Sequence, residues 1–265
     1  MNRIINGLSV NTFGDEKNQS VIFIHGFPYD YTMWEEQINF LKDKYFCVAY
    51  DVRGLGASFV GDGQYTMEFF VDDLFSIISE LKLKNPILCG LSMGGYISLR
   101  AVERNQDLFS TLILLDTRSE ADDNTGKLKR AAGINQINTE GLEKFIKAFV
   151  TFCFADEAPI EQEEMFNRTL QKSYKHNPVG VKGCIIAIMS RTDTTNYLSH
   201  IRIPTLVICG SFDKLTPPLV MRAMAEKIHG SEFAVVPRAG HMTPLENPAN
   251  VNDLIGGFLK RKFGK

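Results

Sequence analysis

Short runs of apolar residues recur along the chain, and the segments between them have the pattern of helices. The runs are VIFI at 21–24, FCVAY at 46–50, PILC at 86–89, TLILL at 111–115, TLVIC at 205–209 and EFAVV at 232–236. Their hydrophobicity is continuous rather than alternating, which is typical of parallel strands that are buried on both faces. The main constraint on the fold is therefore a mostly parallel sheet.

The segments between the runs predict amphipathic helices. Apolar residues recur at spacings of three and four over 67–81, behind Thr66, which is a favourable N-cap. Thr32 and Glu35 have capping-box spacing ahead of another such segment, and Asn247 precedes a proline at the start of a C-terminal helix. Alternating strands and helices predict an α/β fold with helices on both faces, whose ligands bind beyond the carboxyl ends of the strands.

The alternation is interrupted once, between Leu115 and Thr205. That distance along the chain is far longer than the dozen or more residues that a crossover needs. Two amphipathic stripes within it, one behind Thr139 and one over 181–189, predict a small helical cap inserted between two strands. The alternative is an enlarged crossover at the rim of the sheet, with no part in a pocket. The predicted division is 1–118 with 200–265 for the core and 119–199 for the cap.

Composition excludes several classes of protein. The 265 residues are 44% hydrophobic and 23% charged, as in ordinary globular chains with a sizeable core. The 29 Lys and Arg nearly balance the 31 Asp and Glu, so no overall field attracts nucleic acid. Without a secretory leader or a membrane-spanning run, we expect a cytoplasmic protein with no membrane partner. The five cysteines are widely spaced with no CxxC pair, which predicts free thiols and no metal site, and Cys89 and Cys209, each at the end of an apolar run, are expected to be buried.

The segment GLSMGG at 90–95 carries the clearest chemical signal. It follows the strand PILC and precedes a helical pattern, so Ser92 lies on a sharp turn between a strand and a helix. Such a turn strains the backbone and leaves room only for glycine two residues before and two residues after the serine. The short pattern also arises by chance, and its position between strand and helix is what makes Ser92 a candidate nucleophile.

A serine nucleophile needs a base, and the base needs a carboxylate that fixes its tautomer. Asp213 follows the strand TLVIC, and His241 follows the strand EFAVV. Both lie at carboxyl ends of strands, so the predicted triad is Ser92, Asp213 and His241. Asp116, at the end of TLILL, is an alternative acid. The histidines without such a context are expected at the surface: His176, His200 and His229.

Acyl transfer also needs hydrogen-bond donors for the oxyanion that develops on the substrate. The backbone N–H of Met93, which follows the nucleophile, is one predicted donor. The N–H of Phe27, in the loop that follows the strand VIFI, is the other, because the next residue is a proline and has no N–H. His25 in the same loop is expected to brace the backbone rather than to take part in the chemistry.

These motifs together resemble the α/β-hydrolase superfamily over essentially the whole chain. The residues that carry the resemblance are HGFP at 25, YDVRGLGAS at 50, GLSMGG at 90, SFDKLTPP at 211 and GHMTPLENP at 240. The chain order of nucleophile, acid and base is also that of the superfamily. HGFPYDYTMW, DVRGLGAS and the compact cap are similar to carboxylesterases, 3-oxoadipate enol-lactonases and cofactor-free haloperoxidases (perhydrolases).

The resemblance implies a serine hydrolase that cleaves a small carboxylic ester or lactone through an acyl-enzyme, with no cofactor and no metal. It also implies that Trp34 lines the acyl pocket. Arg118, at the entrance to the cap, is placed to pair with a substrate carboxylate, although an exposed arginine is commonly a solvated charge. Two alternatives remain: acyl transfer to peroxide, and a non-hydrolytic regulator or ligand receptor. Acyl length and oligomeric state are not predicted.

Overall fold

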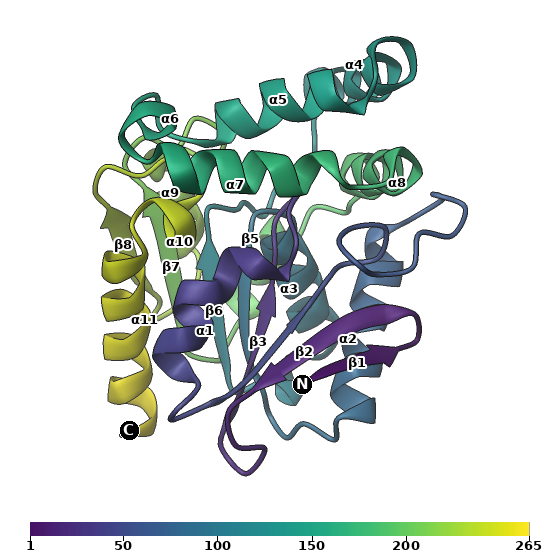
Figure 1. Ribbon diagram of the computed structural model, residues 1–265. Helices are drawn as coiled ribbons and strands as arrows, with labels where there is room; N and C mark the ends of the chain where they lie inside the picture. Colours follow the sequence, from purple (N-terminus) through teal and green to yellow (C-terminus); the bar gives the residue numbers. More distant parts are fainter. Residues whose placement is uncertain (265) are drawn as a thin grey trace.

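The computed structural model describes residues 1–264, and its centre is one eight-stranded sheet with the order β1-β2-β4-β3-β5-β6-β7-β8 (Figure 1). The strands are β1 (Asn2–Ile5), β2 (Leu8–Phe13), β3 (Ser20–Ile24), β4 (Phe46–Tyr50), β5 (Ile87–Leu91), β6 (Thr111–Leu115), β7 (Thr205–Gly210) and β8 (Glu232–Val236). From β4 to β8 the neighbouring strands are parallel, whereas β1 and β2 are antiparallel. The mostly parallel sheet that the apolar runs predict is confirmed.

The strands at the centre of the sheet form its core. Every residue of β3, β4, β5, β6 and β7 is buried. The edge strand β8 differs, because it has a neighbour on one side only and Val235 is 39% exposed. The expectation of burial on both faces was therefore wrong for EFAVV. The hairpin of β1 and β2 was not predicted, since its sequence has no continuous apolar run.

Helices pack around this sheet, with α1 against α11 and α2 against α3 (Figure 1). Their bounds are α1 (Glu35–Leu41), α2 (Met67–Glu80), α3 (Met93–Asn105), α9 (Pro218–Glu226), α10 (Thr243–Glu246) and α11 (Pro248–Phe263). Short 3-10 helices are η1 (Tyr31–Trp34), η2 (Gln106–Leu108) and η3 (Thr195–His200).

The predicted N-caps of two helices are confirmed. Thr66 accepts a hydrogen bond from the N–H of Phe69, and Asn247 accepts one from Asn250. The prediction for Thr32 was wrong, because Asp30 caps η1 and accepts hydrogen bonds from both the N–H and the hydroxyl of Thr32. An aspartate two residues earlier thus begins the helical segment ahead of the threonine.

Five helices occupy the long segment between β6 and β7, and they lie at the top of the molecule in Figure 1. They are α4 (Asn124–Glu140), α5 (Leu142–Cys153), α6 (Ala158–Glu161), α7 (Glu163–Tyr174) and α8 (Pro178–Met189). Helix α4 packs against α5 and α8, and α5 packs against α7. Thr139 lies inside α4 and does not begin α5 as predicted, because Gly141, with a φ of 92°, separates the two helices. The limits at 118 and 200 remain predictions.

The cysteines of the chain lie in its interior. Each of the five cysteines is free and buried. Burial raises the pKa of the Cys153 thiol to about 12, so it stays protonated at neutral pH.

Within residues 1–264, no helix combines the length and the apolar character needed to cross a membrane. In the same range, no cluster of His, Cys, Asp and Glu side chains is arranged to hold a metal ion.

Candidate active site

Ser92 lies on the sharp turn between β5 and α3. Its φ of 53° and ψ of −114° are a strained backbone conformation for a residue with a side chain. A Cβ atom on Gly94 would overlap the carbonyl oxygen of Ile24, so only glycine fits beside β3. The Ser92 N–H donates to the Leu115 carbonyl at 3.0 Å, and the Thr117 hydroxyl donates to the Ser92 carbonyl at 2.8 Å. The end of β6 therefore holds the strained turn in place.

His241 and Asp213 form a buried hydrogen-bonded pair. The Nδ1 atom of His241 lies 2.8 Å from Oδ2 of Asp213. The other carboxylate oxygen accepts the N–H groups of Leu215 and Thr216 at 2.8 and 2.9 Å, and the Thr216 hydroxyl donates to Oδ2. Burial alone would raise the pKa of Asp213, but the charge of His241 and these hydrogen bonds lower it to about 2. Asp213 is therefore ionised at neutral pH and accepts the Nδ1 proton.

The other nitrogen of the His241 ring, Nε2, belongs to a side chain that lines the same cavity as Ser92. The Nε2 atom is buried, and it has no hydrogen-bond partner among residues 1–264. With the proton on Nδ1, Nε2 is an acceptor with a free lone pair. An unpaired acceptor beside a serine in a cavity is the arrangement that a general base requires.

The two residues predicted to supply the oxyanion donors, Phe27 and Met93, lie close to Ser92. Met93 is the first residue of α3, so its N–H has no partner within the helix. Phe27 lines the cavity, and a Cβ atom on the preceding Gly26 would lie 3.3 Å from Cβ of Ser92. The loop after β3 and the start of α3 thus approach the same serine from two directions.

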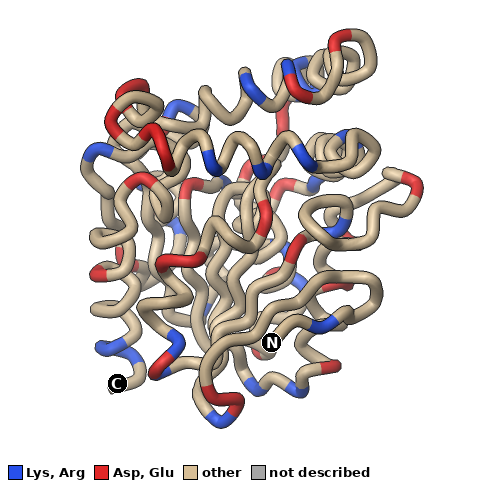
Figure 2. Tube along the Cα trace, in the orientation of Figure 1, with Lys and Arg blue, Asp and Glu red and all other residues tan. Residues whose placement is uncertain are grey.

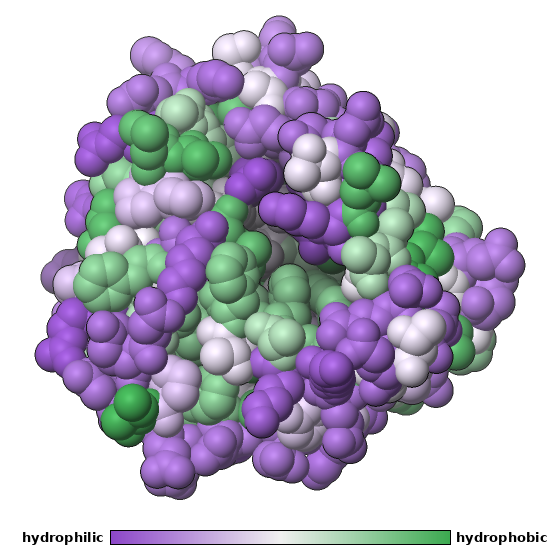
Figure 3. Space-filling view, turned by 90° about the horizontal axis from the view of Figure 1, so that it is seen from above, coloured by the Kyte–Doolittle hydropathy of each residue, from purple (hydrophilic) through white to green (hydrophobic). Residues whose placement is uncertain are grey.

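The cavity has a volume of about 420 Å³ and lies between the sheet and the inserted helices. Seen from the side of the insertion, the surface is hollowed, with hydrophobic residues inside and hydrophilic residues around the hollow (Figure 3). One part of the wall is aromatic, because Phe27 packs against Phe145 and Phe149 with ring centroids 6.3 and 5.4 Å apart. Residues of the inserted helices therefore form part of the wall of the cavity that Ser92 and His241 line.

The two predicted substrate-binding residues differ in position. Arg118 lines the cavity, and its guanidinium donates to the carbonyl oxygen of Leu215. Trp34 does not line it: the indole is fully buried and packs against Phe23, with ring centroids 5.3 Å apart. Trp34 ends η1 with its side chain against the sheet, so it belongs to the core rather than to an acyl pocket.

Asp116, the alternative acid, has other partners. It is fully buried, and its carboxylate accepts hydrogen bonds from the N–H of Gly210 at 2.8 Å and from the hydroxyl of Thr243. Burial, together with the negative charge of Asp213, raises its pKa well above the ordinary value. Of the two candidate carboxylates, Asp213 is the one that contacts His241.

His25 braces the loop after β3, as predicted. Its Nε2 accepts the N–H of Val52 at 2.8 Å, and Nδ1 lies 2.8 Å from the Gly26 carbonyl. Because Nε2 is the acceptor, Nδ1 carries the proton and donates it to that carbonyl. Burial lowers the pKa of His25 to about 4, so the ring is neutral at physiological pH.

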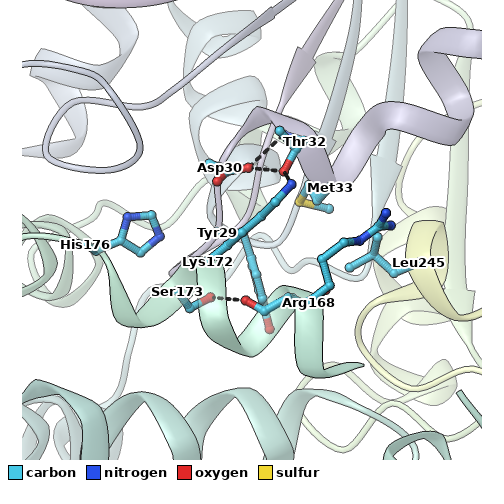
Figure 4. A pocket seen from close by; sticks show the side chains of 10 residues that line it. Tyr29, Asp30, Thr32, Met33, Arg168, Lys172, Ser173, His176 and Leu245 are labelled. Carbon is cyan, nitrogen blue, oxygen red and sulfur yellow. Dashed lines mark hydrogen bonds between the residues drawn. The ribbon is translucent and has the colours of Figure 1, made fainter. Parts of the chain in front are cut away.

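His176 is not a surface residue, contrary to the prediction, although His200 and His229 are exposed. It is 7% exposed and lies just beyond α7, beside a small cavity between α7 and the segment that follows β3 (Figure 4). Its Nδ1 accepts the N–H of Gly56 at 3.1 Å, and Nε2 donates to the Pro28 carbonyl at 3.0 Å. These partners are distant in the sequence, so no local pattern indicates that the ring is buried.

Glu246 is a further residue of the site to which sequence analysis gave no function. It is 5% exposed, and it accepts the N–H groups of Gly240 at 2.9 Å and Met242 at 3.1 Å, on either side of His241. Its other oxygen accepts the N–H of Ala155, in the insertion, at 2.8 Å. The signal was present in GHMTPLENP, where a carboxylate follows the histidine closely within a loop of backbone donors.

The fold and these side chains define an α/β-hydrolase with a strained serine turn beside a buried histidine–aspartate pair. The family model for the alpha/beta hydrolase fold matches residues 19–248, and the chain belongs to this family. The resemblance predicted from the motifs is thereby confirmed.

Individual relatives agree with this assignment. The chain is 27% identical to 3-oxoadipate enol-lactonase 1 of Acinetobacter baylyi over 253 residues, which cover 96% of this chain and 93% of that protein. A thermophilic esterase from Thermogutta terrifontis, solved with malate bound, has a TM-score of 0.92 and 31% identity over 98% of both chains. A bromoperoxidase from Bacillus anthracis shares the fold, with a TM-score of 0.87 and 24% identity over 98% of this chain and all of that one.

Proposed function

We propose that this protein is a serine hydrolase that cleaves a small carboxylic ester or lactone through an acyl-enzyme. The observation that carries the proposal is the orientation of His241. Its Nδ1 is held 2.8 Å from Asp213, its Nε2 has no hydrogen-bond partner among residues 1–264, and its side chain lines the same cavity as Ser92. A general base held in this way is what a serine hydroxyl needs in order to act as a nucleophile.

In the first half of the reaction, Nε2 of His241 takes the proton of the Ser92 hydroxyl while Oγ attacks the substrate carbonyl. A Ser92–carbon bond forms, and the negative charge moves to the carbonyl oxygen. The N–H groups of Phe27 and Met93 donate hydrogen bonds to that oxygen, each contributing about 3 kcal/mol when preorganised. The carbon–oxygen bond of the ester then breaks, and His241 gives its proton to the departing alkoxide.

In the second half, water takes the place of the alcohol. His241 removes a proton from the water as it attacks the acyl carbon, and then returns that proton to Ser92 Oγ as the acyl bond to the enzyme breaks. The products are one carboxylic acid and one alcohol, or a single hydroxy acid from a lactone. Throughout the cycle the Asp213 carboxylate stabilises the imidazolium.

The relatives support the same reaction class. One is named an enol-lactonase and another an esterase, and both cover nearly the whole chain. A cavity of about 420 Å³ is within the range of small-molecule sites, which suits a small ester or lactone. Arg118 is the residue in its wall that we propose as a substrate contact.

A panel of p-nitrophenyl esters from acetate to laurate, together with several lactones, tests the proposal. We expect multiple turnovers with the wild-type protein and a fall in kcat of about 10⁴-fold or more in Ser92→Ala, as in other triads. Ser199→Ala, an exposed serine of η3, is the matched control. Equal turnover in wild type and Ser92→Ala would refute Ser92 as the nucleophile. Acylation of the protein by one equivalent of ester, without further turnover, would favour a ligand receptor.

A further inference from the structure

The active-site cavity has an unusual balance of charge. Over the molecule as a whole, acidic and basic residues are interspersed (Figure 2), and the net charge is −2. Among the cavity-lining residues, however, four side chains are cationic and one is a carboxylate. The cations are Arg118, Lys129, Arg130 and Lys214, and the carboxylate is Asp122.

Helix α4 contributes two of these cations on one face. Its lining residues are Gly126, Lys129, Arg130 and Gly133, which have the spacing of neighbouring positions on a helix surface. A Cβ atom on Gly133 would lie 2.9 Å from the Phe145 ring, so the glycine lets α4 pack close to the aromatic wall. A helix over an apolar cavity ordinarily presents apolar side chains to it. Here α4 presents two cations and two glycines, which leaves space beside the charges.

The single carboxylate does not neutralise this wall. Asp122 is bound to Arg130 at 3.0 Å and to the buried Arg191 at 2.9 Å, so two guanidinium groups share one negative charge. Burial raises the pKa of Asp122, but the two arginines outweigh that effect and lower it. Its charge is therefore present at neutral pH and already engaged.

The remaining cations differ in whether they have a partner. Lys214 pairs with Asp156, whose side chain is 83% exposed. Arg118 and Lys129 have no carboxylate within 4 Å in the part of the chain from 1 to 264. One nitrogen of Arg118 donates to the Leu215 carbonyl, two residues from Asp213, which holds the guanidinium near the reacting groups. The other nitrogens of its fork are left for a ligand.

We infer that the substrate is an ester or lactone that carries a second, ionised carboxylate, an inference that rests on the proposed function. Arg118 binds that carboxylate through its planar fork, and the Lys129–Arg130 face of α4 adds positive charge beside it. The aromatic wall of Phe27, Phe145 and Phe149 holds the uncharged part of the molecule. Hydrolysis then leaves a product with two carboxylates, so small dicarboxylates are expected to inhibit by competing with substrate.

The experiment compares two substrates that differ in one charge: monoethyl glutarate and its neutral analogue, the ethyl ester of glutaramic acid. Ethanol release gives kcat/KM for each with the wild-type protein. We expect a preference for the anion of about tenfold or more, the effect of one hydrogen-bonded charge pair. The preference is expected to fall as KCl is added, because salt screens the partly exposed cations.

Two variants locate the preference. Arg118→Gln and Lys129→Gln are each expected to lower the ratio of the two kcat/KM values severalfold, mainly through KM for the anion. Among residues 1–264, the hydrogen bond to the Leu215 carbonyl comes from Arg118 and not from Lys129, so the Lys129 variant separates charge recognition from any displacement of the Asp213 loop. Arg202→Gln is the matched control, because Arg202 is 73% exposed and does not line the cavity. An equal kcat/KM for both substrates, unchanged in the two variants, would overturn the inference.

Binding measurements separate this inference from the proposed function. Calorimetry with glutarate and with glutaramide needs no turnover, and p-nitrophenyl acetate reports hydrolysis without an anionic group. Absence of hydrolysis of every ester, with glutarate still bound more tightly than glutaramide through Arg118, would refute the enzyme but keep the anion site. Hydrolysis of p-nitrophenyl acetate, with no difference in affinity between glutarate and glutaramide, would refute the anion site but keep the proposed hydrolase.

Discussion

Replacement of Asp213 by asparagine changes one atom beside His241 and tests the proposed acid. The N–H groups of Leu215 and Thr216 both donate to Oδ1 of Asp213. In the variant these donors select the amide oxygen for that position, so the amide nitrogen takes the place of Oδ2. An NH₂ group then faces Nδ1 of His241, where the wild-type carboxylate accepts a proton.

This reversal determines the size of the effect. The amide donates to Nδ1, so the neutral ring must carry its own proton on Nε2 and cannot accept one from Ser92. The same tautomer error in a serine protease costs about 10⁴-fold in kcat, equivalent to about 5.5 kcal/mol of transition-state stabilisation. We expect a loss of this order with p-nitrophenyl acetate, while KM changes little.

Asp116→Asn is the matched comparison. Its carbonyl oxygen can still accept the N–H of Gly210, and its amide can donate to the Thr243 hydroxyl, which also serves as an acceptor. The φ of 45° at this position suits asparagine. Because a buried carboxyl beside Asp213 is removed, we expect an unchanged kcat and a Tm at least as high as that of the wild type.

The opposite pattern would refute this reasoning. If Asp116→Asn abolished turnover and Asp213→Asn kept most of it, the acid of the triad would be Asp116. A loss of activity in Asp213→Asn that came with a large fall in Tm would indicate unfolding rather than a wrong tautomer. Thermal unfolding of each variant, measured by circular dichroism, separates the two explanations.

Three further changes test the surroundings of the site. Gly94→Ala is expected to destabilise the fold by at least about 3 kcal/mol in urea unfolding, because its Cβ meets the Ile24 carbonyl, whereas Gly257→Ala on α11 has room and should be neutral or stabilising. Glu246→Gln leaves the Ala155 N–H unpaired and should cost about 1–3 kcal/mol together with a lower kcat, while the exposed Glu226→Gln should change neither. His25 is neutral in the folded state down to about pH 4 but takes up a proton in the unfolded state below 6.5, so stability should fall by about 3 kcal/mol as the pH drops between these values. This fall in stability with pH should be absent in His25→Asn, and a fall that persisted in the variant would contradict the view that His25 is buried as a neutral ring.

Residues whose surroundings are local in sequence could be placed before the structure was known. The turn at Ser92 depends on consecutive residues and on the strand and helix that flank it. Asp213 and His241 each follow an apolar run that forms a strand, and neighbouring parallel strands bring such positions to one edge of the sheet. The helix behind Thr66 follows from its spacing alone. In each case the deciding interactions lie within one element or its immediate neighbours.

Residues whose surroundings depend on distant packing could not be placed in this way. His176 is buried because α7 packs near the loop after β3, and Glu246 joins the His241 loop to the insertion. Trp34 is of a residue type that is common in binding pockets, but the orientation of η1 directs its side chain into the core. The local capping pattern was present at Thr32, but Asp30, two residues earlier, is the N-cap of η1 instead.

The contacts around Cys153 and Ala155 have a consequence for how this architecture can change. The N–H of His241 donates to the Cys153 carbonyl at 2.7 Å, and Glu246 ties the same loop to the Ala155 N–H. The end of α5 therefore supports the proposed base through its backbone. The insertion is therefore not a fully exchangeable module: a graft that discards the α5 end removes part of the scaffold on which the proposed chemistry depends.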